Sequence, residues 1–579
     1  MTPYRSNREE RPAIAPETGL VADMVRQFAD PYAFLRELAQ NGLDAGASRI
    51  EVRVELPAGA AATTRVTDDG AGMSRATIEG PLLTLFSSSK EESLDMIGRY
   101  GVGFVSVFAL APEEVQIETW QPGSSYLVRL FPDHRYELLE GRARPGSGTV
   151  VTVIKAMDRQ AFLAHAGRCK AALLRWCRHA ERPIRLFVYD LGAEETSGEI
   201  RIDRPVGVFA PISVTRTIAR KGGGEEIFSV GVSPGSAHLD APAPDAASAL
   251  ERADSFAGFY NRGLTLLETN EPLSADLAGL RFKVISPHLS HTISRDDVRR
   301  DADFARVIEV VRRLAREPLR EALVKGLADA ALGATRGETT RAYAAMLEAA
   351  SLPPMSLPAS EIRLPLASPV GGARVLAEPH RDLPKGHPIL VSARRDAITD
   401  ALAAAWIPVV LAAHPAVGAA LQRLAPRAIE EAQEVYLLVR ERDPSSLGEE
   451  ALGLLDALAA QLRAAGAPVA RAGLGAIEGA LDRRAAVVIP EGPAGAARLC
   501  STAQIAAWYN RWSSNDILLL NPAGALWNKA LGKARRAPPL AAHVLARALL
   551  AGRAEAASAK ASDLLLALAG EALRGSEGS

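Results

Sequence analysis

The stretch from Phe34 to Ala45 reads F-L-R-E-L-A-Q-N-G-L-D-A and places Glu37, Asn41 and Asp44 at positions i, i+4 and i+7. At 3.6 residues per turn, this spacing predicts that the three polar side chains share one face of a helix. The leucines of the stretch lie toward other faces and can fix the helix by apolar contact. A row of polar residues on a helix is commonly a solvated face, so its meaning depends on the sequence that follows.

Three glycine-containing motifs follow in order along the chain. Residues 66–73 read V-T-D-D-G-A-G-M, directly after two runs that are typical of strands. Residues 98–104 read G-R-Y-G-V-G-F and lead into an apolar, helix-like run. Residues 147–153 read S-G-T-V-V-T-V and open a further strand. One glycine cluster usually marks only a turn, but the polar helix followed by all three motifs is a specific signal.

Together the four segments resemble the ATP site of the GHKL superfamily, which includes heat-shock protein 90 (HSP90) chaperones, DNA gyrase B, MutL proteins and sensor histidine kinases. The resemblance implies a Bergerat-type ATP-binding α/β sandwich with ATP and Mg²⁺ as cofactors. Glu37 is then expected to be the catalytic base, with Arg36 beside it to hold it until closure. Asn41 is expected to bind Mg²⁺ through its amide oxygen, and Asp44 to support the nucleotide or the waters of the metal.

The glycine motifs would hold the nucleotide itself. Asp68 is expected to accept a hydrogen bond from the adenine amino group. Gly70 and Gly72 would let the backbone approach the ring, Met73 would pack on it, and Thr149 would complete the adenine pocket. Backbone amides at a helix N-terminus are a common anion site, and the residues expected there at the phosphates are Gly98, Gly101, Val102, Gly103 and Phe104.

The second part of the chain decides between branches of the superfamily. Residues 259–268 read F-Y-N-R-G-L-T-L-L-E and residues 293–298 read I-S-R-D-D-V, an order that resembles the middle domain of the HSP90 family. The resemblance implies that Arg295 reaches the ATP as a catalytic residue, where gyrase-type and MutL-type relatives use a lysine. Local sequence alone would favour Ser294 as a helix N-cap followed by a solvated arginine.

The predicted fold class is α/β (α+β) and multidomain. We expect an ATP-binding domain over residues 1–195 with a short lid at about 74–98, an α/β middle domain over 196–440, and a small α+β dimerisation domain over 441–579. Pro318 is expected to kink or restart a long amphipathic helix. Helices over Leu540–Leu550 and Asp563–Leu573 carry leucines that need a partner surface, which is either a second copy of the chain or another part of this one.

Composition narrows the partners. The 67 basic and 68 acidic residues of the 579-residue chain nearly cancel, so no bulk field favours nucleic acid or an anionic membrane. Cys169, Cys177 and Cys500 lack metal-ligand spacing and are expected to be reduced thiols, as in a cytoplasmic protein. No apolar stretch reaches the length of a membrane span.

These observations predict a compact, prokaryotic-type chaperone resembling HSP90. It would be a Mg²⁺-dependent ATPase that forms ADP and phosphate, and a homodimer that opens and closes around unfolded or partly folded client proteins. Two alternatives stay open: an ATPase acting on DNA, of MutL or gyrase B type, and a nucleotide-gated scaffold in a specialised system. A sensor histidine kinase is not expected, because it would need a phosphoacceptor histidine helix before the ATP motifs, and only about thirty residues precede them here.

Overall fold

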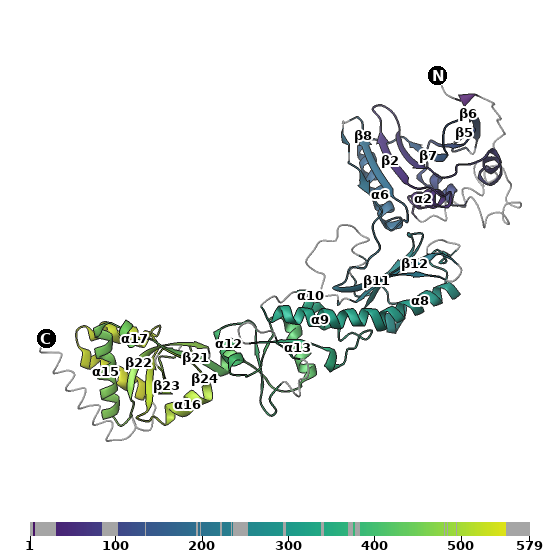
Figure 1. Cartoon of the computed structure of the whole chain (residues 1–579). Coiled ribbons are helices and arrows are strands. Elements are labelled where there is room, and N and C mark those ends of the chain that lie inside the picture. Colours follow the sequence, from purple (N-terminus) through teal and green to yellow (C-terminus); the bar gives the residue numbers. More distant parts are fainter. Residues whose placement is uncertain are drawn as a thin grey trace. The chain divides into compact units, whose positions relative to one another are not determined.

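The structure is a computed structural model that divides the chain into two compact units, residues 1–323 with 351–356 and residues 324–350 with 357–579 (Figure 1). The residues that it describes are 4–5, 30–83, 102–133, 135–192, 195–196, 198–220, 223–232, 234, 250, 253–292, 297–336, 341–368, 374–376, 383–479, 481–482, 484–493 and 495–551.

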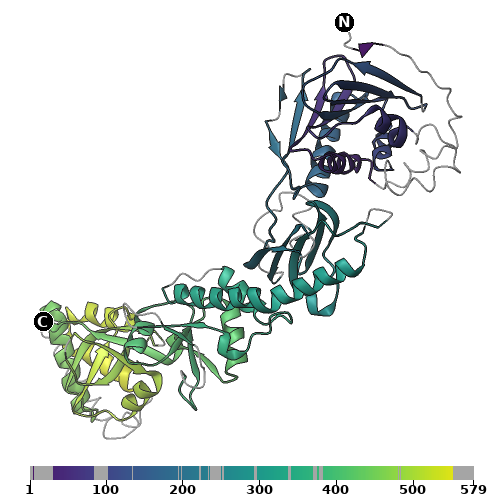
Figure 2. The same cartoon turned by 45° about the vertical axis from the view of Figure 1, so that its right-hand side comes forward.

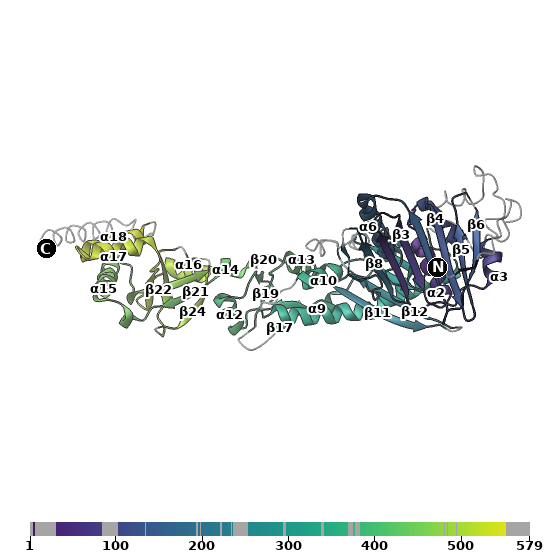
Figure 3. The ribbon, with the colours of Figure 1, turned by 90° about the horizontal axis from the view of Figure 1, so that it is seen from above.

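A ten-stranded sheet forms the first half of the first unit. Its strands follow the order β1-β6-β5-β4-β7-β3-β2-β8-β10, with β9 paired to β8, and several of them can be followed side by side in Figure 3. β2 and β8 are parallel, and the other pairs are antiparallel. The strands are β1 (Tyr4–Arg5), β2 (Ile50–Leu56), β3 (Ala62–Asp68), β4 (Glu114–Gln121), β5 (Ser124–Leu130), β6 (Tyr136–Gly141), β7 (Gly148–Lys155), β8 (Ile184–Asp190), β9 (Glu195–Thr196) and β10 (Ile200–Arg201).

Two helices, α2 (Phe34–Asp44) and α6 (Arg159–Trp176), lead into the parallel strands β2 and β8. They contact each other and the sheet, and both lie on the same side of it (Figure 1). The side chain of Asp158 caps α6 by accepting a hydrogen bond from the amide of Ala161 at 2.7 Å, which satisfies a helix-end donor. Short helical segments complete this part: α3 (Arg75–Thr77), the π-helical turn η1 (Ile78–Leu82), α5 (Val102–Val105) and the 3₁₀ turn η2 (Ser106–Leu110).

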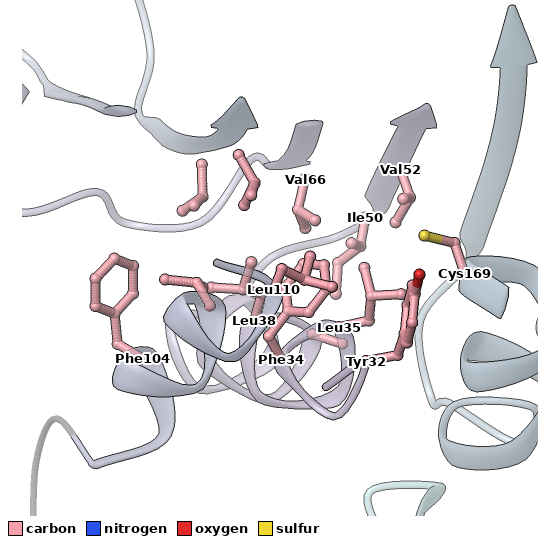
Figure 4. Packing of buried hydrophobic residues seen from close by; sticks show 14 of the residues in the cluster. Tyr32, Phe34, Leu35, Leu38, Ile50, Val52, Val66, Phe104, Leu110 and Cys169 are labelled. Carbon is pink, nitrogen blue, oxygen red and sulfur yellow. The ribbon is translucent and has the colours of Figure 1, made fainter. Parts of the chain in front are cut away.

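The core of this part lies between α2 and the sheet. Alternate residues of β2 are buried, as period-2 geometry requires. Figure 4 shows Phe34, Leu35 and Leu38 pointing from the helix toward Val52 and Val66 of the strands. This packing holds the polar face of α2 at a fixed place above the sheet.

A second, five-stranded sheet follows in the first unit, in the order β11-β12-β15-β13-β14. Its elements are β11 (Ile212–Ala219), β12 (Glu225–Val232), β13 (Phe256–Asn261), β14 (Leu264–Thr269), β15 (Leu280–Ile285) and the 3₁₀ turn η4 (Ala275–Leu277).

The long amphipathic helix covers this sheet, as the sequence predicts. α8 (Ala302–Leu314) buries Val307, Val311 and Leu314, and it can be followed beside the strands in Figure 2. Pro318 lies in a π-helical turn, η5 (Ala315–Leu319), after which the helix restarts as α9 (Arg320–Ala334). The prediction about Pro318 is therefore confirmed, since proline has no amide for the helical hydrogen bond.

Buried polar contacts join the second sheet to the end of α6. Arg178 forms an ion pair with Glu268, and both side chains are less than a tenth exposed. Glu268 also accepts a hydrogen bond from the hydroxyl of Tyr260 at 2.5 Å. The Nζ of Lys283 lies 3.0 Å from Nε2 of His179. Burial and the nearby Lys283 lower the pKa of His179 to about 3, so the neutral ring accepts this hydrogen bond.

The second unit contains two five-stranded sheets, ordered β17-β16-β19-β18-β20 and β23-β25-β22-β21-β24. The strands are β16 (Leu364–Leu366), β17 (Arg374–Leu376), β18 (Ile389–Ser392), β19 (Val409–Leu411), β20 (Ile429–Glu431), β21 (Tyr436–Glu441), β22 (Arg471–Gly479), β23 (Ala486–Pro490), β24 (Ala497–Ser501) and β25 (Asp516–Leu520). The helices are α10 (Arg341–Ala349), η6 (Ala359–Glu361), α12 (Ala397–Ala404), α13 (Pro415–Leu424), α14 (Ala432–Val435), η7 (Pro444–Ser446), α15 (Glu449–Ala464), α16 (Thr502–Asn510), α17 (Ala525–Ala534) and α18 (Pro538–Leu550).

Helix α18 has partners inside its own chain. It packs on α15 and α17, as Figure 3 shows, and Leu545, Leu549 and Leu550 are buried there. The intrachain partner that the sequence left open therefore exists for this helix. The second leucine-rich helix expected, over residues 563–573, lies outside the described residues.

The multidomain α/β (α+β) fold class is confirmed. The three-domain division at residues 195 and 440 stays a prediction beside the two units described above. All three cysteines are unpaired and buried, and burial raises the pKa values of Cys169 and Cys177 to about 12. In the part of the chain that the structure describes, no helix is long and apolar enough to cross a membrane.

Gly263→Ala tests the close approach between the second sheet and the end of α6. Gly263 has φ +78°, and a Cβ there would lie 1.7 Å from the carbonyl oxygen of His179. Gly123, in the β4–β5 turn, has φ +90° and open space around it. We expect Gly123→Ala to cost about 1–2 kcal/mol through backbone strain, and Gly263→Ala about 1–3 kcal/mol more through the clash. Urea unfolding of both variants measures the difference; equal losses would contradict this packing.

Candidate functional site

A cavity of about 190 Å³ lies in the first unit, beside α2 and the ends of β3 and β7. Most of its lining is apolar, and Asn41, Asp68 and Thr149 contribute polar groups. Such a pocket suits a flat, largely apolar ring that is oriented by a few polar contacts. The lining residues are Leu38, Asn41, Ala45, Val66, Asp68, Gly72, Met73, Thr77, Leu82, Phe104, Ile117, Thr149 and Val151.

The exposure of the polar and charged side chains of α2 varies along the helix. Glu37 and Arg36 are each 6% exposed, whereas Asn41 and Asp44 are exposed. Asn41 lines the cavity, but Asp44 does not. Asp44 instead accepts hydrogen bonds from Gln40 at 3.1 Å and from Arg262 at 3.2 Å.

Arg36 lies on the α6 side of the helix. Its guanidinium is 5.3 Å from the centre of the Trp176 ring, a distance suited to a cation–π contact. Burial lowers the pKa of Arg36. The expectation that Arg36 restrains Glu37 stays a prediction.

Asp68 ends β3 at the inner edge of the cavity, opposite Thr149 in the β3–β7 register. Its Oδ1 accepts a hydrogen bond from the amide of Gly70 at 2.9 Å. Burial raises the pKa of Asp68, although the amides of Gly70 and Thr149 act in the opposite direction. A half-buried carboxylate that keeps acceptor capacity can recognise an amino group.

The loop after Asp68 approaches β4 so closely that only glycine fits. Gly72 has φ +67°, and a Cβ there would lie 2.1 Å from the carbonyl oxygen of Trp120. The next amide, that of Met73, donates to Oγ1 of Thr119 at 2.8 Å. Gln121 donates from its side chain to the carbonyl of Ala71 at 3.1 Å.

Residues 119–121 carry no motif, and the sequence did not single them out. The sequence signal here is the alternation of polar and apolar residues over 114–118, which indicates a strand but not which strand it pairs with. The strand register of the structure shows that β4 pairs with β7 and that Thr119 lies opposite Thr149. The hydroxyls of Thr119 and Thr149 lie 3.2 Å apart, and Thr149 lines the cavity.

The expected phosphate end of the site is described only in part. Val102 and Gly103 belong to α5, and Phe104 of the same helix lines the cavity. Gly98 and Gly101 lie outside the described residues, as does Arg295. Of the expected lid, residues 74–83 form α3 and the turn η1, and the rest also lies outside them.

Among the described residues, no group of three or more His, Cys, Asp or Glu side chains could hold a metal ion. Mg²⁺ in nucleotide sites usually takes one or two protein oxygens and completes its shell with phosphates and water. The amide of Asn41, at the edge of the cavity, fits that requirement.

Comparisons with known proteins agree with this geometry. Residues 32–132 match the family described as histidine kinase-, DNA gyrase B- and HSP90-like ATPase. The chaperone protein HtpG of Methylobacterium sp. (strain 4-46) is 30% identical over 220 residues, covering 33% of this chain and 35% of the relative. HtpG of Methylobacterium nodulans is 29% identical over 218 residues, with coverage of 33% and 35%.

HtpG of Methylococcus capsulatus is 30% identical over 193 residues, covering 28% of this chain and 29% of the relative. The chain thus spans about a third of the length of these curated relatives. The family match contains α2, the Asp68 loop and α5, and an ATPase domain of this kind implies nucleotide binding. The chain therefore contains an ATPase domain of the histidine kinase-, DNA gyrase B- and HSP90-like kind, and over the third of its length that aligns it is similar to HtpG chaperone proteins.

Proposed function

We propose that this protein is an ATP-dependent molecular chaperone that hydrolyses ATP in the cavity beside α2. The observation that carries the proposal is the half-buried carboxylate of Asp68, which lines a largely apolar pocket together with Asn41. It lies inside the segment that matches the ATPase family.

Adenine would enter the apolar pocket and donate its amino group to Asp68. The left-handed turn at Gly72 brings the backbone against β4, and this leaves room for the ring next to Met73. Thr149 completes the polar edge through its hydroxyl. Gly70 holds the carboxylate in place through its amide, so little reorganisation is needed on binding.

Hydrolysis would use the polar face of α2. Asn41 would hold Mg²⁺ against the phosphates, and the ion would neutralise their charge. Glu37, one turn earlier on the helix, would accept the proton of the attacking water or orient it. Arg36 would restrain Glu37 until the site closes, and Asp44 would support the waters at the outer edge.

The remaining contacts to the phosphates are proposed from the family resemblance. Backbone amides of Gly98, Gly101, Val102, Gly103 and Phe104 would bind the phosphates at the start of a helix. Arg295 would reach the γ-phosphate from the second domain and stabilise the charge that develops there. Turnover would then depend on the arrangement of the two domains.

The wider biology rests on the curated relatives, which are named chaperone proteins. We propose that the chain acts on unfolded or partly folded client proteins in the cytoplasm, as a homodimer whose opening and closing follow the nucleotide. Dimerisation would use the C-terminal region. The dimer surface would lie on the C-terminal helices away from the leucines of α18, because these are buried within one chain.

Glu37→Ala and Arg295→Ala test the division of roles. Both variants should bind ATP within about threefold of the wild type, since neither removes an adenine contact. Glu37→Ala should abolish hydrolysis, and Arg295→Ala should slow it by about 100-fold or more. Steady-state ATPase rates and calorimetric titration measure the two properties.

Matched controls are Glu113→Ala and Arg299→Ala, at exposed positions of the same domains, which should leave both properties unchanged. Normal hydrolysis by Arg295→Ala would contradict the HSP90-type completion of the site. DNA binding by the wild type would then be measured, because a MutL-type or gyrase-type ATPase becomes the better description.

The ionisation of Asp68 predicts how ATP affinity depends on pH. The adenine amino group needs the ionised carboxylate, and burial raises the pKa of Asp68. ATP affinity should therefore fall as the pH decreases through this raised pKa. The fall should begin at a higher pH than for an ordinary aspartate, whose pKa is about 3.9.

Titration of ATP into the wild type and Asp68→Asn at several values from about pH 7 to about pH 4 checks this. The nucleotide phosphates titrate in the same way in both experiments. A difference in pH dependence between the two proteins is therefore due to Asp68. Asp68→Asn should bind weakly throughout. An identical pH dependence in both proteins would exclude Asp68 as the adenine acceptor.

A further inference from the structure

The turn between β13 and β14 carries an arginine in a strained backbone conformation. Arg262 has φ +48° and Gly263 has φ +78°, so both central residues of this two-residue turn are left-handed, as in a type I′ hairpin. The carbonyl of Arg262 accepts a hydrogen bond from the amide of Glu181 at 3.1 Å. The missing side chain of Gly263 lets the turn lie against the carbonyl of His179.

The side chain of Arg262 reaches the end of the nucleotide helix. Its Nη1 donates to the carbonyl of Leu43 at 2.8 Å and to Oδ1 of Asp44 at 3.2 Å. Its Nε lies 3.8 Å from Oε1 of Glu181. The guanidinium is therefore held between the last turn of α2 and the loop after α6.

Arg262 supplies a positively charged donor at the C-terminal end of α2. The last turn of α2 contains no basic residue, although the carbonyls at a helix C-terminus carry partial negative charge and need donors. The carbonyl of Leu43 also accepts a hydrogen bond from the amide of Gly46. Arg262 adds the charged donor, and it comes from the second sheet.

The second sheet holds Arg262 in place. The next residue of the hairpin, Leu264, is 1% exposed and belongs to the same core cluster as the leucines of α2. Thr265 donates from its hydroxyl to the carbonyl of Arg175 at 2.8 Å. Glu268, on the same hairpin, forms the buried ion pair with Arg178. The arginine thus projects from a firmly docked turn.

We propose that Arg262 is a positioning residue, by which the second domain sets the place of the catalytic face of α2. Asn41 lies two residues before Leu43 in the same helix, so a shift of the helix end moves its amide within the cavity. Small displacements of such a group cost large factors in rate. The inference rests on the proposed function, because it concerns turnover of ATP in that site.

The test compares the wild type, Arg262→Ala and Arg262→Lys as full-length proteins. Hydrolysis is expressed as kcat per ATP-binding site, with the number of sites taken from titration, so a partly inactive sample does not lower it. Arg262→Ala should lose about tenfold in kcat, and amide hydrogen exchange should accelerate at residues 41–47. Arg262→Lys keeps one charged donor and should recover most of both properties.

Arg216→Ala is the matched control, because Arg216 is exposed on β11 of the same sheet and bonds only its neighbour's carbonyl among the contacts described. It should change neither property. Unchanged exchange at residues 41–47 in Arg262→Ala would overturn the inference even if the protein hydrolysed no ATP. Unchanged kcat in that variant would overturn it while the proposed function stood. A wild type without ATP turnover would overturn both.

Discussion

The burial of two charged residues in helix α2 constrains the packing around the candidate site. Arg36 and Glu37 are each almost fully removed from water in α2, and a buried charge without compensation costs several kcal/mol. The ring of Trp176, which lies against the guanidinium of Arg36, offsets part of this cost. Phe34 and Leu38 pack this helix on the sheet (Figure 4).

The adenine pocket depends on a second constraint, which is steric. The loop at Gly72 passes so near β4 that any Cβ would overlap the carbonyl of Trp120. Hydrogen bonds from Met73 to Thr119 and from Gln121 to the loop then fix its path. Together, the rigid helix and the pinned loop form a pocket between elements whose positions are set by the core, and such preorganisation lowers the cost of binding.

Local sequence predicted much of this arrangement. The spacing of Glu37, Asn41 and Asp44 and the strand alternation around them placed α2 and its strands, because both periodicities are local properties. The depth of each polar residue could not be read in this way. Asp44 shares a face with Asn41 but lies outside the cavity, where it meets an arginine 218 residues later in the chain.

Other features depended on contacts between distant segments. Thr119 acquires its role through the register of β4 with β7, and the contact of Arg262 with α2 requires the whole second sheet to be docked. The strand β6 was also not expected. The leucines of α18 show the same limit: their spacing indicated a buried face but could not tell an intrachain partner from a second copy.

Binding of ATP and of inosine triphosphate to the full-length protein tests the central claim most directly. The two nucleotides share their phosphates and sugar, and inosine lacks the amino group that Asp68 is proposed to accept. A charge-assisted hydrogen bond of this kind predicts that ATP binds about tenfold more tightly or better. Equal affinities, or no binding of either nucleotide, would contradict an adenine site at Asp68.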